Sequence, residues 1–157
     1  MKKQGGFTLI ELVVVIVILG ILAVTAAPRF LNLQNDARKS SLQGLKGALD
    51  GAAGIVYGKA AINGVETASS ATDVDGISTI YGYPMATSAG IGQAVVGLTS
   101  DWTSQPDGTA MVITFKDDDA LSSATAVKGT NCYVTYTQAS DTSVSAAYST
   151  GVTDSGC

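Results

Sequence analysis

The strongest pattern in the chain is an almost wholly apolar stretch over residues 7–27. A helix of these 21 residues would be about 31 Å long, close to the ~30 Å hydrocarbon core of a bilayer. β-Branched residues crowd its centre, but a backbone inside lipid must satisfy its own hydrogen bonds, so a helix is still expected. Lys2 and Lys3 precede the stretch and mark the cytoplasmic side, which places the rest of the chain across the membrane.

A second, amphipathic pattern follows after Pro28. The composition turns polar, yet apolar residues recur at steps of three and four, which describes one apolar stripe on a helix. The clearest part of this stripe is Leu42, Leu45, Leu49, Ala52 and Val56. The pattern predicts that one helix continues to about Gly58, with residues 7–28 as its membrane part and residues 29–58 as its amphipathic part. Gly20 and Pro28 weaken this helix, and proline usually kinks the chain.

Glycines form another stripe on the same predicted helix. Their spacing equals that of the apolar stripe but is shifted by two residues, about 200° around the helix. Its members are Gly44, Gly47, Gly51, Gly54 and Gly58. Each costs about 0.8–1 kcal/mol against alanine. One explanation of the glycine stripe is chance, since the chain has 18 glycines. The other is that the leucine face packs on a sheet and the glycine face lets helices of neighbouring subunits approach closely.

The remainder of the chain predicts turns and then strands. Residues 59–108 carry the turn signals Asn63-Gly64, Asp75-Gly76 and Asp107-Gly108, with a short helix or irregular structure over residues 90–102. These turn signals predict a loop region between helix and sheet. Strand patterns are clearer in residues 109–157, over residues 111–115, 132–137 and 144–148. The fold class predicted is α+β, with a long N-terminal helix packed on a small antiparallel sheet.

Composition and charge narrow the chemistry. A chain of 157 residues is enough for one domain, and its formal net charge of −4 argues against general nucleic-acid binding. The absence of histidine removes Ser-His-Asp and Cys-His catalysis, so no enzyme and no cofactor is expected. Asp117-Asp118-Asp119 and the pair Asp73 and Asp75 offer oxygen ligands for calcium, but their spacing is not that of an EF-hand loop. Solvated turns explain them better, and no metal site is predicted.

Two cysteines lie in the C-terminal quarter of the chain. In an oxidising compartment Cys132 and Cys157 are expected to form one disulfide. A metal pair is the weaker alternative, because the chain has no histidine and no third cysteine.

The residues around the apolar stretch argue against an ordinary secretory signal. Such a signal places small residues after its apolar core and is cut there. Here the pair Gly5-Gly6 comes first, so a cut before Phe7 would remove only the leader of residues 1–6 and leave the apolar helix in place. A plain membrane anchor would not explain Glu11, whose carboxylate costs about 2.5–3.5 kcal/mol in lipid.

The motif Gly6-Phe7-Thr8-Leu9-Ile10-Glu11-Leu12, after a short basic leader, resembles the type IV pilin and pseudopilin family. The likeness is close over about the first 55 residues, and the whole chain is most similar to major type IVa pilins. It implies cleavage after Gly6 by a prepilin peptidase, which also N-methylates Phe7. It further implies that Glu11 serves assembly and that the helix between Gly20 and Pro28 can unwind in a filament.

Cleavage would give Glu11 a cation, the new α-amine of Phe7. This amine can belong to the same chain, one helical turn away, or to a neighbouring subunit, where the pair would also set the stagger between helices. The resemblance favours the neighbour.

The function implied is that of the major structural subunit of a type IV pilus. The partners implied are copies of itself in a helical homopolymer, the prepilin peptidase, the inner-membrane assembly machinery and membrane lipid. The chain would sit in the inner membrane with its C-terminal part periplasmic, and then in an extracellular pilus used for attachment, biofilm formation or retraction. The alternatives are a pseudopilin of a type II secretion system and a minor pilin that binds DNA or carbohydrate.

Overall fold

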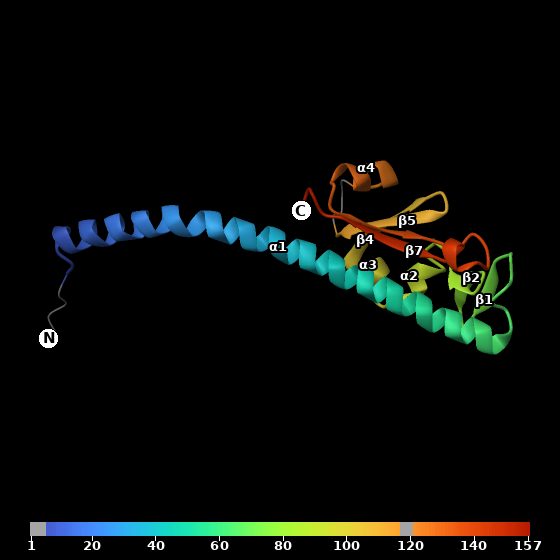
Figure 1. Ribbon diagram of the computed structural model, residues 1–157. Coiled ribbons are helices and arrows are strands. Elements are labelled where there is room, and N and C mark those ends of the chain that lie inside the picture. Colours follow the sequence, from blue (N-terminus) through green and yellow to red (C-terminus); the bar gives the residue numbers. More distant parts are fainter. Residues whose placement is uncertain (1–5, 117–120) are drawn as a thin grey trace, which may run out of the picture. The chain divides into compact units, whose positions relative to one another are not determined.

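One long helix precedes two small antiparallel sheets in the computed structural model (Figure 1). The structure describes residues 6–116 and 121–157, except for the side chains of residues 27–32. The chain forms two compact units, Met1–Ala37 and Arg38–Cys157, and helix α1 (Leu9–Asn63) contributes to both. The other elements described are β1 (Thr72–Val74), β2 (Ile77–Ile80), β3 (Tyr83–Pro84), α2 (Ile91–Ala94), α3 (Leu98–Asp101), β4 (Trp102–Asp107), β5 (Ala110–Phe115), α4 (Ala124–Gly129), β6 (Tyr133–Thr137), η1 (Val144–Ala146) and β7 (Ser149–Thr153). The predicted α+β class is confirmed.

Helix α1 ends at Asn63, later than the predicted end near Gly58. The glycine that stops it is Gly64, which has a positive φ of 71°. The N–H of Gly64 donates to the carbonyl of Ala61 and the N–H of Val65 to the carbonyl of Ala60. This pair of bonds is a Schellman motif, which satisfies carbonyls that the helix end leaves open. The prediction that the helix ends near Gly58 was wrong, because the backbone hydrogen bonds of the helix continue past this residue.

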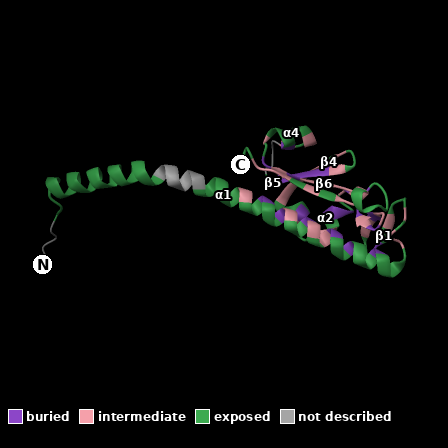
Figure 2. Cartoon of the chain, viewed as in Figure 1, coloured by how far each residue is buried: buried purple, intermediate pink, exposed green. Residues whose placement is uncertain are grey.

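The apolar stripe of α1 forms one wall of the core of the C-terminal unit. Its buried members are Leu42, Leu45, Leu49, Ala53, Val56 and Ala60. The prediction named Ala52 in place of Ala53, which was wrong, since Ala52 is only half-buried. In Figure 2 the buried positions of this part of α1 lie on the side that faces the strands.

The main sheet has the strand order β4-β5-β6-β7, antiparallel throughout. From β5 and β6, Met111, Ile113, Val134 and Tyr136 join the leucines of α1 in one core. Helix α4 lies over the other face of the sheet (Figure 1). Strand β4 begins at Trp102, inside the region predicted to be a loop. The sequence did not predict this strand because it contains a proline, which argues against a strand. A proline is tolerated here because β4 lies at the edge of the sheet.

The third predicted strand, residues 144–148, is wrong. That segment contains the short helix η1, and Val144 is 96% exposed. The strand that pairs with β6 is β7, in the register Tyr133 opposite Thr153. β7 is an edge strand with few apolar residues, so it lacks the alternation on which strand prediction depends. The strands predicted over residues 111–115 and 132–137 are confirmed as β5 and β6.

The smaller sheet, β1-β2-β3, is built from two hairpins with two-residue turns. Asp75-Gly76 and Tyr81-Gly82 have positive φ at both turn positions, 54° and 85° in the first and 49° and 76° in the second. Such turns match the twist of the flanking strands. Residues 90–102, for which a short helix or irregular structure was expected, contain the two short helices α2 and α3. Residues 59–108 are therefore largely structured.

Two hydrogen bonds connect the smaller sheet to the main one. The hydroxyl of Tyr136 donates to the carbonyl of Pro84 at 2.7 Å, and the side-chain oxygen of Gln138 accepts from the N–H of Ala86 at 3.0 Å. Burial raises the pKa of Tyr136, and the neighbouring Tyr148, Tyr83 and Asp50 add to that effect. The phenol therefore stays protonated and remains a donor to Pro84.

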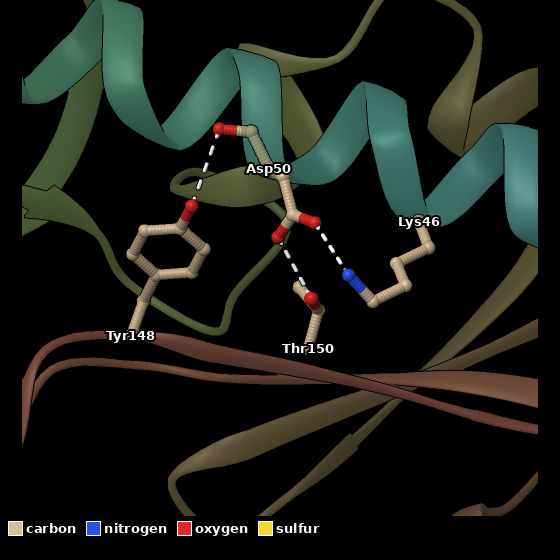
Figure 3. Close-up of polar contacts among 4 residues, drawn as sticks. All are labelled: Lys46, Asp50, Tyr148 and Thr150. Atoms are coloured by element: carbon tan, nitrogen blue, oxygen red, sulfur yellow. Dashed lines mark hydrogen bonds and ion pairs between the residues drawn. The ribbon is translucent and has the colours of Figure 1, made fainter.

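Asp50 ties α1 to β7 (Figure 3). Its carboxylate accepts from Lys46 Nζ at 2.7 Å and from Thr150 Oγ1 at 2.7 Å, and its carbonyl accepts from the Tyr148 hydroxyl at 3.4 Å. Partial burial raises the pKa of Asp50, but the bonds from Lys46 and Thr150 and the charge of Lys46 together hold it below its ordinary value. The ionised carboxylate is thus the form that the folded C-terminal unit favours.

We predict that Asp50→Asn destabilises the full chain in detergent by about 1 kcal/mol at pH 7, since the side chain is partly solvated. The pKa of Asp50 is lower folded than unfolded, so its stabilisation is complete above the unfolded pKa and is lost as the pH falls through the folded one. The difference between the two proteins should therefore shrink in acid. Denaturant titrations at pH 7 and pH 3, followed by Trp102 fluorescence, measure it.

The matched control is Asp75→Asn, which breaks an exposed ion pair with Lys59 of 3.2 Å. Exposed pairs contribute little, so this variant should change the free energy of unfolding by less than about 0.5 kcal/mol. Equal losses in the two variants at pH 7 would mean that Asp50 has no special part in holding the helix to the sheet.

Candidate functional site at the start of the long helix

Thr8 and Glu11 form a reciprocal cap at the N-terminus of α1. The N–H and the hydroxyl of Thr8 both donate to Glu11 Oε2 at 2.8 Å, and the N–H of Glu11 donates to Thr8 Oγ1 at 3.3 Å. This is a capping box, in which two backbone donors that the helix leaves open are satisfied by side chains. The helix accordingly begins at Leu9.

The cap adds a role for Glu11 that the sequence analysis missed. The signal was present, since Thr-x-x-Glu before an apolar run is the pattern of a capping box. Among the described residues, the hydrogen bonds to this carboxylate all go to Oε2. The second carboxylate oxygen of Glu11 therefore remains available to bind a cation. The cap holds the carboxylate beside the backbone of Thr8, the residue after Phe7.

The surface around this cap is apolar and unburied. Leu9–Ala26 is the one helix segment in the described chain with the length and composition to cross a membrane, and none of it is buried. Phe7, just before the cap, is 90% exposed. Gly6 and Gly20 have no atom within 4 Å of the place where a Cβ would stand. Such a surface requires lipid or other protein around it.

The remaining predicted site residues fall outside this cluster. Pro28 lies within α1, but its side chain is outside the described residues. Cys132 and Cys157 are joined in a disulfide in the C-terminal unit, with their Cα atoms 4.9 Å apart. This disulfide links the residue just before β6 to Cys157.

The acidic residues considered for calcium do not make a site in the described structure. Asp117, Asp118 and Asp119 lie outside the described residues. Asp73 accepts from the N–H of Gly76 within the hairpin turn, and Asp75 pairs with Lys59. No group of three metal-ligating side chains occurs among the residues described.

A second exposed surface runs along the C-terminal half of α1, opposite the buried stripe. All five glycines of the predicted stripe are exposed, and a Cβ at any of them would touch nothing within 4 Å. Exposed apolar residues continue the surface, with Ile55 77% and Ile62 83% exposed. We call the row the glycine–isoleucine face; its members are Gly44, Ala48, Gly51, Ile55, Gly58 and Ile62. The sequence analysis missed the isoleucines, although Ala48, Ile55 and Ile62 recur every seven residues.

These features define a class of protein: an α+β fold with a long N-terminal helix whose apolar surfaces exceed what the described chain covers. Comparison with known proteins also points to the start of the long helix. The family model described as the prokaryotic N-terminal methylation motif matches residues 1–27. No solved structure matches the chain significantly.

The curated relatives match about a third of the chain. The "Type IV narrow pilus major component PilA5" of Thermus thermophilus is 46% identical over 47 residues, which is 30% of this chain and 40% of that protein. The "Type II secretion system core protein G" of Klebsiella pneumoniae is 46% identical over 54 residues, 32% of this chain and 39% of the relative. The protein of the same name from Pseudomonas aeruginosa is 42% identical over 53 residues, 31% of this chain and 37% of its own length.

The match thus spans about two fifths of each relative's length. Residues 1–27 thus carry the methylation motif, and part of the chain is similar both to a type IV pilus component and to secretion-system core proteins G. The two kinds of relative match over stretches of similar length and at similar identity, so the comparison does not separate a pilus subunit from a pseudopilin.

We predict that the chain isolated from its native host begins at N-methylated Phe7. Intact-mass and N-terminal peptide analysis would show this. Gly6→Val should keep residues 1–6 attached, because a branched side chain hinders the close approach of a peptidase to the backbone. A start near Ala27 in the unaltered chain would identify an ordinary signal peptide and overturn the assignment of Gly6 and Phe7.

Proposed function

We propose that this chain is the structural subunit of a type IV pilus, which polymerises through α1. The observation that carries the proposal is that α1 exposes two apolar surfaces its own fold leaves uncovered, the segment Leu9–Ala26 and the glycine–isoleucine face. Lipid can cover the first before assembly, and helices of neighbouring subunits can cover both afterwards. Glycine and alanine at such a contact allow close approach of the helix backbones.

Glu11 would supply the charge pairing in this assembly. Moving an ionised carboxylate from water into a helix bundle is costly unless a cation accompanies it. Cleavage before Phe7 creates such a cation, the methylated α-amine of a neighbouring subunit. The capping box holds Glu11 Oε2, and the second oxygen is available for that amine.

The pilus subunit is preferred over a pseudopilin because of the C-terminal disulfide. The bridge between Cys132 and Cys157 closes the C-terminal region, as in the major type IVa pilins that the chain resembles, among them the mannose-sensitive haemagglutinin pilins. On this proposal the chain waits in the inner membrane with its C-terminal unit in the periplasm. A prepilin peptidase and the inner-membrane assembly machinery then bring it into an extracellular filament used for attachment, biofilm formation or retraction.

The competing assignment is a pseudopilin of a type II secretion system, which the similarity to the core protein G relatives favours. Electron microscopy of the cell surface, with mass spectrometry of sheared filaments, separates the two. A pilus subunit should be the bulk component of long surface filaments. Filaments that lack this chain, together with a loss of protein secretion on its deletion, would assign it to the secretion system.

We predict that Glu11→Gln lowers filament assembly at least tenfold while leaving the helix start intact. Glutamine can replace glutamate in a capping box, so this variant removes the charge and keeps the cap. Tenfold corresponds to about 1.4 kcal/mol, a modest part of the cost of a buried, unpaired amine. The measurement is the amount of subunit in sheared filaments relative to the amount in the membrane.

The matched variant Thr8→Val removes the side-chain half of the cap and keeps the charge. It should assemble better than Glu11→Gln if charge pairing dominates. Normal assembly of Glu11→Gln together with a defect in Thr8→Val would show that Glu11 acts as a cap and that its pairing with a neighbouring amine is unnecessary.

We further predict that Gly51→Leu blocks assembly without destabilising the C-terminal unit. A side chain at Gly51 meets no atom of its own fold, and leucine is a better helix former than glycine by about 0.5–1 kcal/mol. The thermal midpoint should hold or rise, while the protein accumulates in the membrane and few filaments form.

The control is Gln43→Leu, at an exposed position of the same helix about 100° away from the glycine–isoleucine face. This variant should assemble normally. If Gly51→Leu also assembles normally, the glycine–isoleucine face is not a contact between subunits, and the glycines reflect the composition of the chain.

A further inference from the structure

A small cavity of about 310 Å³ opens in the C-terminal unit. Its walls come from the end of α1, the turn between β2 and β3, and the loop that precedes β7, and these segments meet near β1 and β2 (Figure 1). The side chains that matter are the rings of Tyr57, Tyr81 and Tyr83 and the carboxylates of Glu66 and Asp141.

The cavity carries negative charge without a matching cation. No lysine or arginine lines it. Glu66 Oε2 is shielded from solvent and receives no hydrogen bond within the described chain, and no ion pair joins Glu66 to the described residues. A shielded carboxylate oxygen without a donor is costly, so the absence of a counter-charge here requires an explanation. Asp141 lies at the exposed mouth, held by the N–H of Ser143 at 2.6 Å.

The aromatic wall suits a cation as well. Tyr57 and Tyr83 stack with their ring centroids 4.5 Å apart and an interplanar angle of 19°. Within the described residues, no hydrogen bond engages the hydroxyls of Tyr57, Tyr81 and Tyr83. An aromatic face attracts an organic cation through its quadrupole, more strongly where water is excluded.

The turn that presents Tyr81 has an unfavourable conformation for that residue. Tyr81 has a φ of 49° at a position of a two-residue hairpin turn where asparagine, aspartate or glycine is preferred. The next residue must be glycine, because a Cβ at Gly82 would approach Tyr57 Cδ2 to 2.9 Å and Glu66 Cα to 3.0 Å. A strained, bulky residue at a closely packed cavity wall is a common sign of function.

We propose that this cavity binds the primary ammonium group of a lysine-like side chain or amine, with Glu66 and Asp141 as its counter-charges and the tyrosine rings around its alkyl stem. The volume is at the small end of ligand sites, which fits one side chain rather than a larger molecule. A neutral sugar could use the rings and the hydroxyl groups but would leave the charge uncompensated. The cavity uses none of the residues to which the proposed function assigns polymerisation.

The test uses the full chain in detergent micelles and two probes of nearly equal shape. One is Nα-acetyl-lysine N-methylamide, which carries the ammonium, and the other is Nα-acetyl-2-aminoheptanoic acid N-methylamide, in which a methyl group replaces that ammonium. Calorimetric titration with saturation-transfer NMR should show binding of the first and at least tenfold weaker binding of the second. Glu66→Gln should weaken the charged probe by about tenfold, and Asp75→Asn, which removes a carboxylate outside the cavity, should not.

A second variant separates binding from folding. Tyr81→Asn places a residue suited to the turn, so the thermal midpoint should rise, while loss of the ring should weaken the charged probe about threefold or more. A merely structural tyrosine would give the first effect without the second.

A cross-linking arm identifies the source of the ammonium. Carbodiimide treatment of membranes that hold mixed ¹⁴N- and ¹⁵N-labelled chains should join Glu66 or Asp141 to a lysine of a second copy if subunits supply it. If the charged probe binds but no such link forms, the ligand is a separate amine or another protein. Equal affinity for the two probes, binding unaffected by Glu66→Gln, saturable binding of a neutral methyl glycoside in place of the amine, or neither binding nor cross-links would overturn the proposal.

Discussion

The structure depends on one constraint: α1 carries more apolar surface than the chain's own fold buries. The C-terminal unit covers the stripe from Leu42 to Ala60, and nothing in the described chain covers Leu9–Ala26. Exposed apolar surface of this extent has a large free-energy cost in water, at roughly 25 cal/mol per Å². Lipid or other protein must therefore supply the missing contacts, and the proposed function provides both, lipid before assembly and copies of the helix afterwards.

The way the helix attaches to its sheet determines which surface remains for neighbours. Leucines on one side of α1 enter the core with Met111, Ile113, Val134 and Tyr136, and the contacts of Asp50 with Lys46 and Thr150 fix the helix against β7. A side chain in place of any glycine on the opposite side would contact nothing else in the described fold. The free energy by which these glycines destabilise the helix is therefore not offset by packing within the single chain. On the proposed function, the same rotation of the helix would serve both the fold of one subunit and the contact between subunits.

Glu11 illustrates how one residue can satisfy two requirements at once. In the single chain its carboxylate completes a capping box with Thr8, which gives the exposed start of α1 a defined first turn. In a filament the same carboxylate would need a cation, because water no longer solvates it. A glutamine would meet the first requirement and not the second.

Features that rest on local chemistry could be predicted from the sequence: the apolar and amphipathic course of α1, the strands β5 and β6, the turn at Asp75-Gly76 and the pairing of Cys132 with Cys157. Local patterns suffice there because helix periodicity, buried strands and turn glycines each leave a strong signal.

Other features became visible only in the folded chain. They are the edge strands β4 and β7, the end of α1 at Gly64 rather than Gly58, and the meeting of Tyr57, Tyr81 and Glu66 around one cavity. Edge strands bury too few side chains to show alternation of apolar and polar residues. The helix passes through Gly58 because its backbone hydrogen bonds continue there. The residues of the cavity come from separate segments, which become neighbours only when the sheets pack on the helix.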